Sequence, residues 1–377
     1  MHRLQFHYTL SKSASPATVR NPLIDLLQAV SNAGSISAGA RQLGLSYRHV
    51  WGELKRWETE LGGELLIWEK GQSARLSEFG NKLMWAERQA QARLAPQIEA
   101  LRAELERSFA VAFDDASHVV TLYASHDDAL SRLRETALQN LGKAEGRLHL
   151  DIRFTGSVDA IRALNEGRCV MAGFHTLDNI GHIGKGTLTE RIYKPLLQPG
   201  LHKIIGFASR TQGLLVAPDN PLKVSGLSDL TSAKKGKPVR FANRALGTGT
   251  RVILDELLAA AKLNAADING YDHTEPSHAA VAHAVLSGQA DAGLGIEAAA
   301  VQAGLGFVPL VKENYHLVCL KSALDLPSIA ALRALLQTPE WRNEIALIPG
   351  YEVKDTAQSG QVLSMRKVLP WWDYRKP

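Results

Sequence analysis

Apolar residues recur every three or four positions in the first part of the chain, a spacing that predicts amphipathic helices. The pattern gives one helix over 22–33, a second over 36–43 and a third over 46–61, with a serine at the cap position of the last two. Gly44 lies in the turn between the second and third helices. Two short helices joined by a turn that contains glycine are typical of a helix-turn-helix motif.

The residues after the third helix complete this first domain. A strand-like run at 65–68, a polar turn and a second short strand predict a hairpin, which we interpret as the wing of a winged helix-turn-helix domain over residues 1–77. Ser77 then caps a long helix that carries a continuous apolar stripe. We assign residues 78–110 to a linker or dimerisation helix, although a helix packed on its own domain fits the same pattern.

Strand-like and helical segments alternate from residue 118 onward. The pattern predicts strands at 119–125, 148–155, 169–175, 214–217, 239–242 and 292–295, and helices at 127–141, 158–166, 250–261 and 278–286. This alternation predicts an α/β domain with mainly parallel sheets.

Composition agrees with a folded protein of two or three domains. The chain has 377 residues, of which 45% are hydrophobic and 21% are charged, as in ordinary globular proteins. No window approaches 18 consecutive apolar residues, and the amino terminus has no apolar signal region. The two cysteines, Cys169 and Cys319, exclude a disulfide framework and fit a reducing compartment. We therefore expect a cytoplasmic protein.

The distribution of charged residues along the chain is more informative than the net charge. Residues 1–57 hold seven Lys or Arg against two acids, so this segment carries the whole net charge of +5 and the remainder is neutral. A basic segment attached to a neutral body indicates a polyanionic partner, and double-stranded DNA fits a helix-turn-helix. A solvated basic surface without a partner is the alternative that charge alone leaves open.

The third helix and the wing supply the candidate DNA contacts. A recognition helix needs long donors near its amino end, and Arg48 is suited to a bidentate contact with a guanine edge. The other candidates are side chains left outside the apolar stripe of this helix, or placed in the wing, from where they could reach bases or phosphates. The full set is Ser46, Tyr47, Arg48, His49, Lys55, Arg56, Lys70 and Arg75.

Polar residues also follow several predicted strands of the α/β domain, each at the start of a helix. Helix starts offer free N–H groups and the positive end of the helix dipole, so three such turns that converge would bind a small oxoanion. An arginine in one of these turns would add charge-assisted hydrogen bonds. The candidates are Ser125, His126, Asp127, Ser157, Arg244, Gly247, Thr248, Gly249, Thr250, Arg251 and, on a later helix, His278.

Other chemistries have little support. The GTGT stretch at 247–250 lacks the spacing and the lysine of a Walker loop, and no dinucleotide fingerprint follows a first strand. No H-E-x-x-H pair occurs, and His278 and His283 are five residues apart, so no metal site is expected. No Ser, His and acid are spaced as a triad. We expect no cofactor and no catalysis.

The amino-terminal residues resemble a known family. The stretch GSISAGARQLGLSYRHVWGELKRWETELGGELL, with the later ARLSEFG, is similar to the winged helix-turn-helix of LysR-type regulators, and still more to that of molybdate-responsive regulators. The resemblance covers about residues 22–108. It implies a DNA-binding transcriptional regulator that forms a homodimer or a dimer of dimers.

The blocks NRALGTGTR and ADAGLGIEAAA resemble the periplasmic-binding-protein-like domain related to molybdate-binding proteins. This resemblance implies a bilobed type 2 α/β domain over 118–349, with one lobe at about 118–205 and 312–349 and the other at 206–311. Ser125, Ser157, the loop from Arg244 to Arg251, and Tyr315 would face the cleft between the lobes. Residues 350–377 are left as a carboxyl-terminal tail.

The two resemblances together predict a ligand-responsive regulator. Relatives of this architecture bind molybdate or tungstate, and a small carboxylate such as formate would suit the same donors. A solute-binding receptor and a small-anion enzyme are the alternatives from other classes, and an anion-binding protein without a regulatory role is a third.

Overall fold

The computed structural model describes residues 21–67, 75–113, 118–139, 148–178, 185–234, 236–352 and 358–372. The chain divides into two units, Met1–Ile98 and Glu99–Pro377. Wing residue Lys70 lies outside the described residues. Among those that are described, no helix combines the length and the hydrophobicity that crossing a membrane requires.

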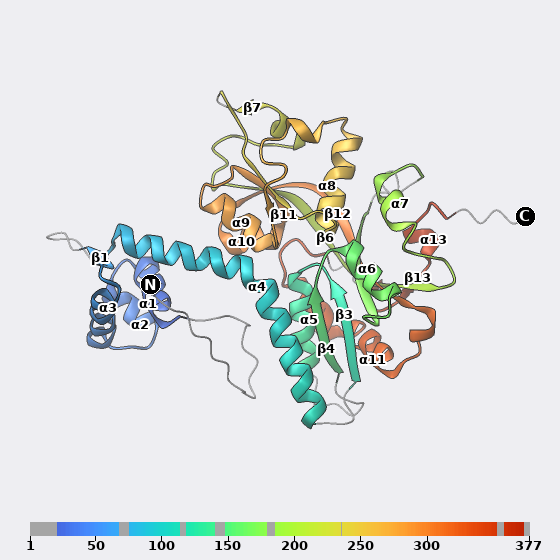
Figure 1. Cartoon of the computed structure of the whole chain (residues 1–377), viewed down its shortest axis with the longest axis horizontal. Coiled ribbons are helices and arrows are strands. Elements are labelled where there is room, and N and C mark those ends of the chain that lie inside the picture. The colour runs from blue at the N-terminus through green and yellow to red at the C-terminus, as the bar shows by residue number, and fades with distance from the viewer. Residues whose placement is uncertain are drawn as a thin grey trace, which may run out of the picture. The chain divides into compact units, whose positions relative to one another are not determined.

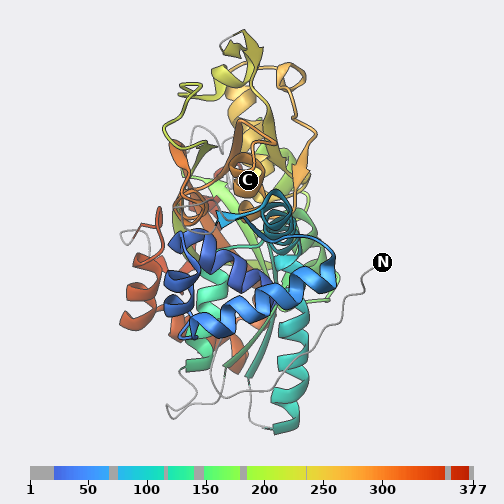
Figure 2. The ribbon, with the colours of Figure 1, turned by 90° about the vertical axis from the view of Figure 1, so that its left-hand side faces the viewer.

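The first unit is the expected helix-turn-helix with a short hairpin. Its helices are α1 (Pro22–Ala33), α2 (Ile36–Gln42) and α3 (Tyr47–Leu61), and its antiparallel strands are β1 (Leu66–Ile67) and β2 (Arg75–Leu76). The three helices pack against one another (Figure 2, blue) around a core that includes Leu27, Val30, Val50 and Leu54. A Cβ atom at Gly39 would lie 3.0 Å from the backbone of Ala29, so a small residue at this position allows α1 and α2 to pack closely.

Helix α4 (Glu78–Phe113) runs from the first unit into the second. The hydroxyl of Ser77 accepts a hydrogen bond from the backbone N–H of Gly80 at 2.9 Å, as expected of its cap. Pro96 lies inside the helix without ending it.

The second unit is built on one nine-stranded sheet. Its strands are β3 (His118–Ala124), β4 (Leu148–Phe154), β5 (Met171–Leu177), β6 (His202–Val216), β9 (Phe241–Arg244), β10 (Thr274–Glu275), β11 (Ala292–Ile296), β12 (Gly306–Leu320) and β13 (Val362–Leu363). They follow the order β10-β9-β11-β6-β12-β5-β3-β4, with β13 paired to β6. A separate hairpin joins β7 (Ala233–Lys234) to β8 (Lys237–Pro238).

The prediction of mainly parallel pairing was wrong. β3 pairs in parallel with β4 and β5, and β9 with β10 and β11, but β6 is antiparallel to β11, β12 and β13, and β12 is antiparallel to β5. The strand expected at 214–217 is only the end of β6, a 15-residue strand. Its partner β12 was not predicted. Both strands carry buried polar residues that interrupt the apolar pattern.

β6 and β12 join two lobes (Figure 1). Up to Val311, β12 pairs with the part of β6 that also pairs with β11. From Glu313 onward, β12 pairs with β5 on its other side. The two strands therefore pass from one lobe to the other close to Gln212 and Glu313. The helices of the unit are α5 (Asp128–Gln139), α6 (Ser157–Asn165), α7 (Leu188–Tyr193), α8 (Gly249–Ala260), α9 (His278–Leu286), α10 (Glu297–Ala303), α11 (Pro327–Leu336), α12 (Pro339–Ala346) and α13 (Met365–Val368).

The carboxyl-terminal segment is part of this unit, which corrects the expected boundary at 349/350. Tyr351 forms a bridge with Arg210 of β6, and β13 extends the sheet beside Ile204 and Ile205. Trp371 is 1% exposed within the core that also contains Phe174. The segment therefore contributes to the domain core and, through Tyr351, to the polar cluster described below.

Candidate functional site

Helix α3 presents a polar face at its amino end. Ser46 caps the helix by accepting a hydrogen bond from the N–H of His49 at 3.2 Å. Val50 is buried, whereas Tyr47, Arg48 and His49 are exposed. Arg48 has no ion pair with any described residue, so its guanidinium is available to a partner.

Lys55 and Arg56, two other predicted DNA-contacting residues, form ion pairs with acidic residues of the same domain. Lys55 pairs with Glu58 at 2.6 Å, and Glu58 also accepts hydrogen bonds from the N–H groups of Leu65 and Leu66. Burial opposes ionisation of Glu58, but the hydrogen bonds from Lys55, Leu65 and Leu66 together hold its pKa below its usual value. Arg56 pairs with Glu53 at 2.7 Å and with Glu60 at 3.6 Å, while Arg75 is an exposed residue of β2. Glu58 thus anchors the start of the hairpin, and Lys55 is held by its ion pair with Glu58.

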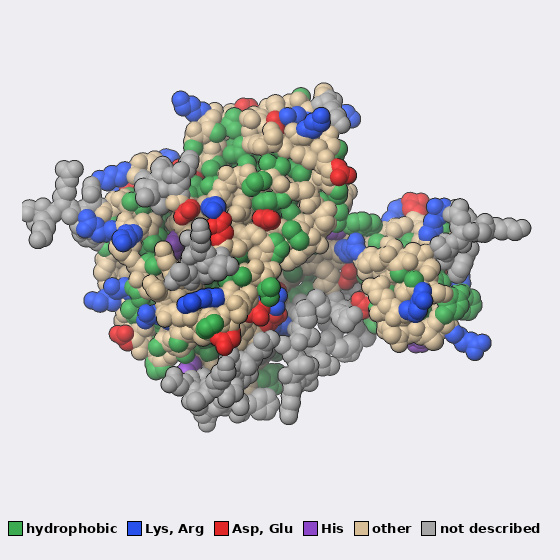
Figure 3. Space-filling model, turned by 180° about the vertical axis from the view of Figure 1, so that it is seen from behind, with side chains coloured by type: hydrophobic (Ala, Val, Ile, Leu, Met, Phe, Trp, Pro, Cys, Tyr) green, Lys and Arg blue, Asp and Glu red, His purple; other side chains and the backbone are tan. Residues whose placement is uncertain are grey.

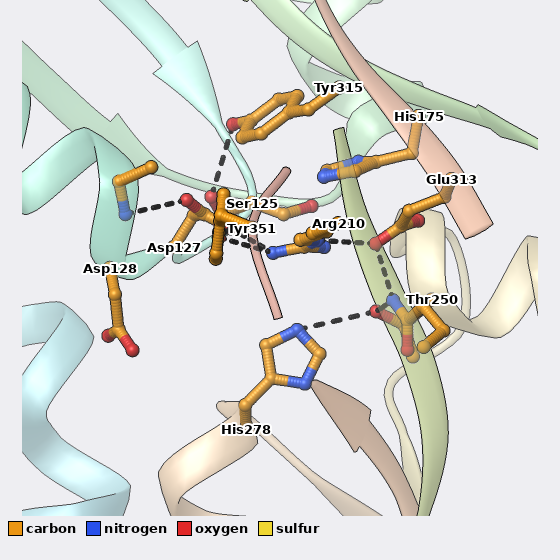
Figure 4. Close-up of polar contacts among 12 residues, drawn as sticks. Ser125, Asp127, Asp128, His175, Arg210, Thr250, His278, Glu313, Tyr315 and Tyr351 are labelled. Carbon is orange, nitrogen blue, oxygen red and sulfur yellow. Dashed lines mark hydrogen bonds and ion pairs between the residues drawn. The ribbon is translucent and has the colours of Figure 1, made fainter. Parts of the chain in front are cut away.

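In the second unit, the guanidinium of Arg210 lies at the centre of a buried polar cluster (Figure 4). It donates to Asp127 through Nη1 and to Glu313 through Nε, and Nη1 also lies 3.3 Å from the hydroxyl of Tyr351. That hydroxyl donates to Asp127 at 2.6 Å, while the ring of Tyr315 lies 5.7 Å from the guanidinium carbon. Burial alone would lower the pKa of Arg210, but the two carboxylates raise it well above its usual value.

Arg244, at the end of β9, is the second buried arginine, and it forms no ion pair with any described residue. It is 2% exposed, and its Nε and Nη1 atoms meet no hydrogen-bond acceptor in the part of the chain that the structure describes. Burial and the positive charge of Arg210 lower the pKa of Arg244 to about 9. Asp127 and Glu313 act in the opposite direction without offsetting these two effects. A buried cation without a direct ion pair is costly, so this position is suited to an anion supplied from outside the chain.

The turns that follow β4 and β9 meet at this cluster. Gly156 and Gly247 come together, because a Cβ atom on Gly156 would lie 2.7 Å from the carbonyl oxygen of Gly247. The hydroxyl of Ser157 lies 3.5 Å from that of Ser125 and 3.3 Å from Nδ1 of His175. These contacts bring together residues from both lobes.

Thr250 links the strands to helix α9. Its hydroxyl accepts a hydrogen bond from Nε2 of Gln212 at 3.0 Å and lies 3.5 Å from Nε2 of His278. Burial, assisted by the charges of Arg244 and Arg210, lowers the pKa of His278 well below its usual value. Burial and Arg210 do the same for His175, so both imidazoles are neutral near pH 7.

The structure brings together seven residues of the predicted set, Ser125, Asp127, Ser157, Arg244, Thr250, His278 and Tyr315, with Gly247 and Gly249 in the surrounding turn. The remaining three predicted ligand residues, His126, Thr248 and Arg251, have other contacts. His126 lies 3.7 Å from Glu99 of α4, and Thr248 caps α8. Arg251 pairs with Asp255 and lies 3.9 Å from the centre of the Tyr271 ring, so its charge is already compensated.

Sequence reasoning missed five members of the cluster, namely His175, Arg210, Gln212, Glu313 and Tyr351. Four of them lie on β5, β6 or β12, and Tyr351 follows α12. Charged and amide side chains within otherwise apolar strands were the available signal, as in FASRTQGLLV around Arg210. Within the described ranges, no group of three or more His, Cys, Asp or Glu is arranged to hold a metal ion.

Comparison with known families matches residues 138–337 to the PBP superfamily domain, which is more than half of the chain. The chain belongs to the PBP superfamily. Residues 23–81 of this PBP superfamily protein match the bacterial regulatory helix-turn-helix proteins of the lysR family, which agrees with α1 to α3 and the hairpin.

Two curated proteins resemble parts of this PBP superfamily chain. The uncharacterized protein YvgK of Bacillus subtilis (strain 168) is 32% identical over 231 residues, which cover 61% of this chain and 69% of YvgK. An uncharacterized protein from the 5′ region of a ferredoxin 2Fe-2S gene of Clostridium pasteurianum is 31% identical over 108 residues, 28% of this chain and 96% of that protein.

Solved LysR-type regulators resemble the chain more distantly. A hydrogen-peroxide-bound OxyR mutant of Corynebacterium glutamicum covers 86% of this chain and 94% of its own, at 15% identity and a TM-score of 0.44. ArgP of Mycobacterium tuberculosis covers 84% of this chain and 96% of its own, at 20% identity and a TM-score of 0.39.

Proposed function

We propose that this chain is a DNA-binding transcriptional regulator whose PBP superfamily domain senses a small anion. The lysR-family helix-turn-helix supports the first part, and the second rests on the buried Arg244, whose Nε and Nη1 atoms have no hydrogen-bond acceptor among the described residues. Figure 3 shows acidic and basic side chains interspersed on the visible face of the larger unit. Attraction of an anion would therefore come from local donors rather than from a broad positive surface.

The donors around Arg244 suit a compact anion. Nε and Nη1 of Arg244 would give charge-assisted hydrogen bonds, and the hydroxyls of Ser125 and Ser157 and the neutral ring of His278 could add neutral ones. A bound anion would give Arg244 a direct ion pair in place of the hydration that burial removes. These donors by themselves would accept molybdate or tungstate, which the family resemblance suggests, or formate, and the choice among anions depends on the buried acceptors of the same cluster.

Helix α4 offers a route from this site to the DNA-binding unit. Glu99 of α4 lies 3.7 Å from Nε2 of His126 and accepts a hydrogen bond from Ser131 at 3.0 Å. Burial opposes ionisation of Glu99, but the nearby His126, the charge of Arg134 and the hydrogen bond from Ser131 together hold its pKa below its usual value. His126 precedes Asp127, which pairs with Arg210, so a rearrangement at the cluster would reach α4 through adjacent residues.

A panel of anions tests the sensing function. Full-length protein is heated with molybdate, tungstate, sulfate, phosphate, formate or glycolate, and its unfolding temperature is recorded. A ligand at 100 times its dissociation constant stabilises the folded state by about 2.7 kcal/mol. At least one anion should raise the unfolding temperature, and a flat response across the panel would reject an anion sensor.

The DNA-binding function is tested by Arg48→Ala on DNA fragments that the wild-type protein selects from a random pool. The variant should lose specific DNA binding and keep the anion response, because Arg48 lies in the other unit from the anion site. Arg162→Ala is the matched control, since Arg162 is an exposed arginine of α6 paired with Asp159. Equal loss of DNA binding in both variants would contradict the role of Arg48.

A further inference from the structure

Two buried acceptors near Arg244 are also without partners. Gln212 donates through Nε2 to Thr250 at 3.0 Å and to Oε1 of Glu313 at 2.7 Å. Its own amide oxygen meets no donor among the described residues, and the same holds for Oε2 of Glu313. Both side chains are fully buried. Buried acceptors without donors are rare in folded proteins and indicate that a missing molecule supplies the hydrogen atoms.

The orientation of the Gln212 amide is fixed by its neighbours. Oε1 of Glu313 already accepts a hydrogen bond from Nε of Arg210, so it is an acceptor. Gln212 must therefore turn its nitrogen toward Glu313, which leaves the amide oxygen as an acceptor. This conclusion does not depend on the protonation state of the other carboxyl oxygen of Glu313.

These acceptors and the Arg244 donors belong to one buried neighbourhood. Thr250 connects Gln212 to His278 through its hydroxyl. The charge of Arg244 acts on His278, and the charge of Glu313 acts on Arg244. His278 also borders Gly295, where a Cβ atom would lie 3.5 Å from Nδ1 of the ring, so the glycine keeps that side of the ring uncrowded.

We propose that the ligand is a small anion that retains a hydroxyl group, with its charge on Arg244 and the one hydrogen atom of its hydroxyl donated to the free oxygen of Gln212 or of Glu313. This inference rests on the anion-sensing function proposed above and names the chemical class of the anion. Monohydrogen phosphate and a hydroxy carboxylate such as glycolate share this chemistry. Sulfate and acetate are their counterparts without the hydroxyl.

The physical reason lies in the cost of an unmatched acceptor. An anion without a hydroxyl would bring its lone pairs against the oxygens of Gln212 and Glu313 and offer neither of them a hydrogen atom, so the acceptor that a hydroxyl would satisfy stays buried without a donor. A site built to accept from a hydroxyl therefore rejects the analogue that lacks it. Tetrahedral ions that carry no proton at neutral pH, molybdate and tungstate among them, fall in the disfavoured class with sulfate.

Calorimetric titration of the full-length protein at pH 7.5 tests the proposal with two matched pairs. Monohydrogen phosphate is compared with sulfate, which has the same charge and a similar size, and glycolate is compared with acetate. At least one hydroxyl-bearing member should bind tenfold or more tightly than its counterpart. Tighter binding of phosphate than of sulfate would identify the ligand class as an inorganic oxoanion. Tighter binding of glycolate than of acetate would identify it as a hydroxy carboxylate.

Glu313→Gln supplies a second readout. Turning the free carboxyl oxygen into an amide nitrogen replaces an acceptor by a donor, so the preference should fall at least tenfold or reverse. Glu256→Gln is the control, because Glu256 is a buried acid of α8 that accepts from the backbone and hydroxyl of Thr189 outside this cluster. The control should leave the preference unchanged.

The outcomes separate the two proposals. The hydroxyl requirement would be overturned, and anion sensing left in place, if the two anions of each pair bound with equal affinity. It would also be overturned if Glu313→Gln preferred the hydroxyl-bearing anion as strongly as the wild type does. Absence of binding by all four anions, together with a flat response to molybdate, tungstate and formate, would overturn both.

Discussion

Arg210 and Arg244 are both buried in the same cluster, but only Arg210 is paired with carboxylates of the described chain. Asp127 and Glu313 flank Arg210 and raise its pKa, whereas burial lowers the pKa of Arg244 to about 9. A base whose pKa is lower in the folded state opposes folding when it is charged. At neutral pH the Arg244 charge therefore lowers the stability of the folded protein, and the proposed anion would offset this loss.

Arg244→Met should lose the anion response without losing the fold. The substitution removes an unpaired buried charge and keeps an unbranched side chain. The free energy of unfolding without ligand should stay the same or rise, by up to about 4 kcal/mol. The unfolding temperature, measured with and without the anion that most stabilises the wild type, checks both expectations. Retained anion stabilisation in this variant would exclude Arg244 as the anchor.

Arg210→Met should behave in the opposite way. It leaves Asp127 and Glu313 buried without their shared cation, and breaking a buried pair in this manner costs about 3–5 kcal/mol. Urea unfolding of the ligand-free protein measures this loss. A variant as stable as the wild type would show that the two carboxylates do not depend on Arg210.

Gly249→Ala should disturb the meeting point of the lobes. A Cβ atom at Gly249 would lie 2.4 Å from Nδ1 of His175, so the ring and the turn must shift. Overpacking of this kind costs about 1–3 kcal/mol of unfolding free energy and should also weaken anion binding. Gly226→Ala is the control, because a Cβ atom at that position meets no heavy atom within 4 Å. Equal effects of the two substitutions on anion affinity would contradict the steric argument.

His316 makes part of the stability dependent on pH. Burial lowers the pKa of His316 to about 3, while an unfolded histidine titrates near 6.5. Below pH ~6.5 the unfolded chain binds a proton that the folded chain does not, so stability falls by about 1.4 kcal/mol per pH unit from this residue. His316→Gln keeps a partner for Thr176, which lies 3.0 Å from the ring, and removes the titration.

Urea unfolding at pH 7, 6 and 5 checks this expectation. The difference in stability between the wild type and His316→Gln should shrink or change sign as the pH falls. The exposed His273 provides the control variant His273→Gln. A difference between wild type and His316→Gln that stays constant over this range would contradict a buried neutral imidazole.

Glu99→Gln should separate anion binding from its effect on DNA. The variant removes the carboxylate that α4 presents to His126 and Arg134, so anion affinity should persist while the anion-induced change in DNA affinity shrinks. Glu104→Gln, also on α4 and 3.8 Å from Arg153, is the control. Fluorescence titration of labelled DNA measures the change, and an unaltered anion effect in Glu99→Gln would exclude this route.

Local patterns identified the elements with strong periodicity and the turns with helix caps. Ser46, Ser77 and Thr248 cap helices because short polar side chains before an apolar stripe satisfy free N–H groups, a relationship within a few residues. Ser125, Ser157 and Thr250 were found for the same reason. The centre of the cluster escaped prediction because Arg210, Glu313 and Tyr351 lie more than 100 residues apart in the chain and meet only through the folding of the sheet.

The most direct test is a titration of selected DNA by wild-type protein and by Arg244→Met, each with and without a saturating concentration of the anion that most stabilises the wild type. The anion should change the DNA affinity of the wild type by at least about fivefold, in the range of ordinary allosteric coupling. Arg244→Met should bind DNA as the ligand-free wild type does, with no response to the anion. An anion response in Arg244→Met equal to that of the wild type would contradict the account.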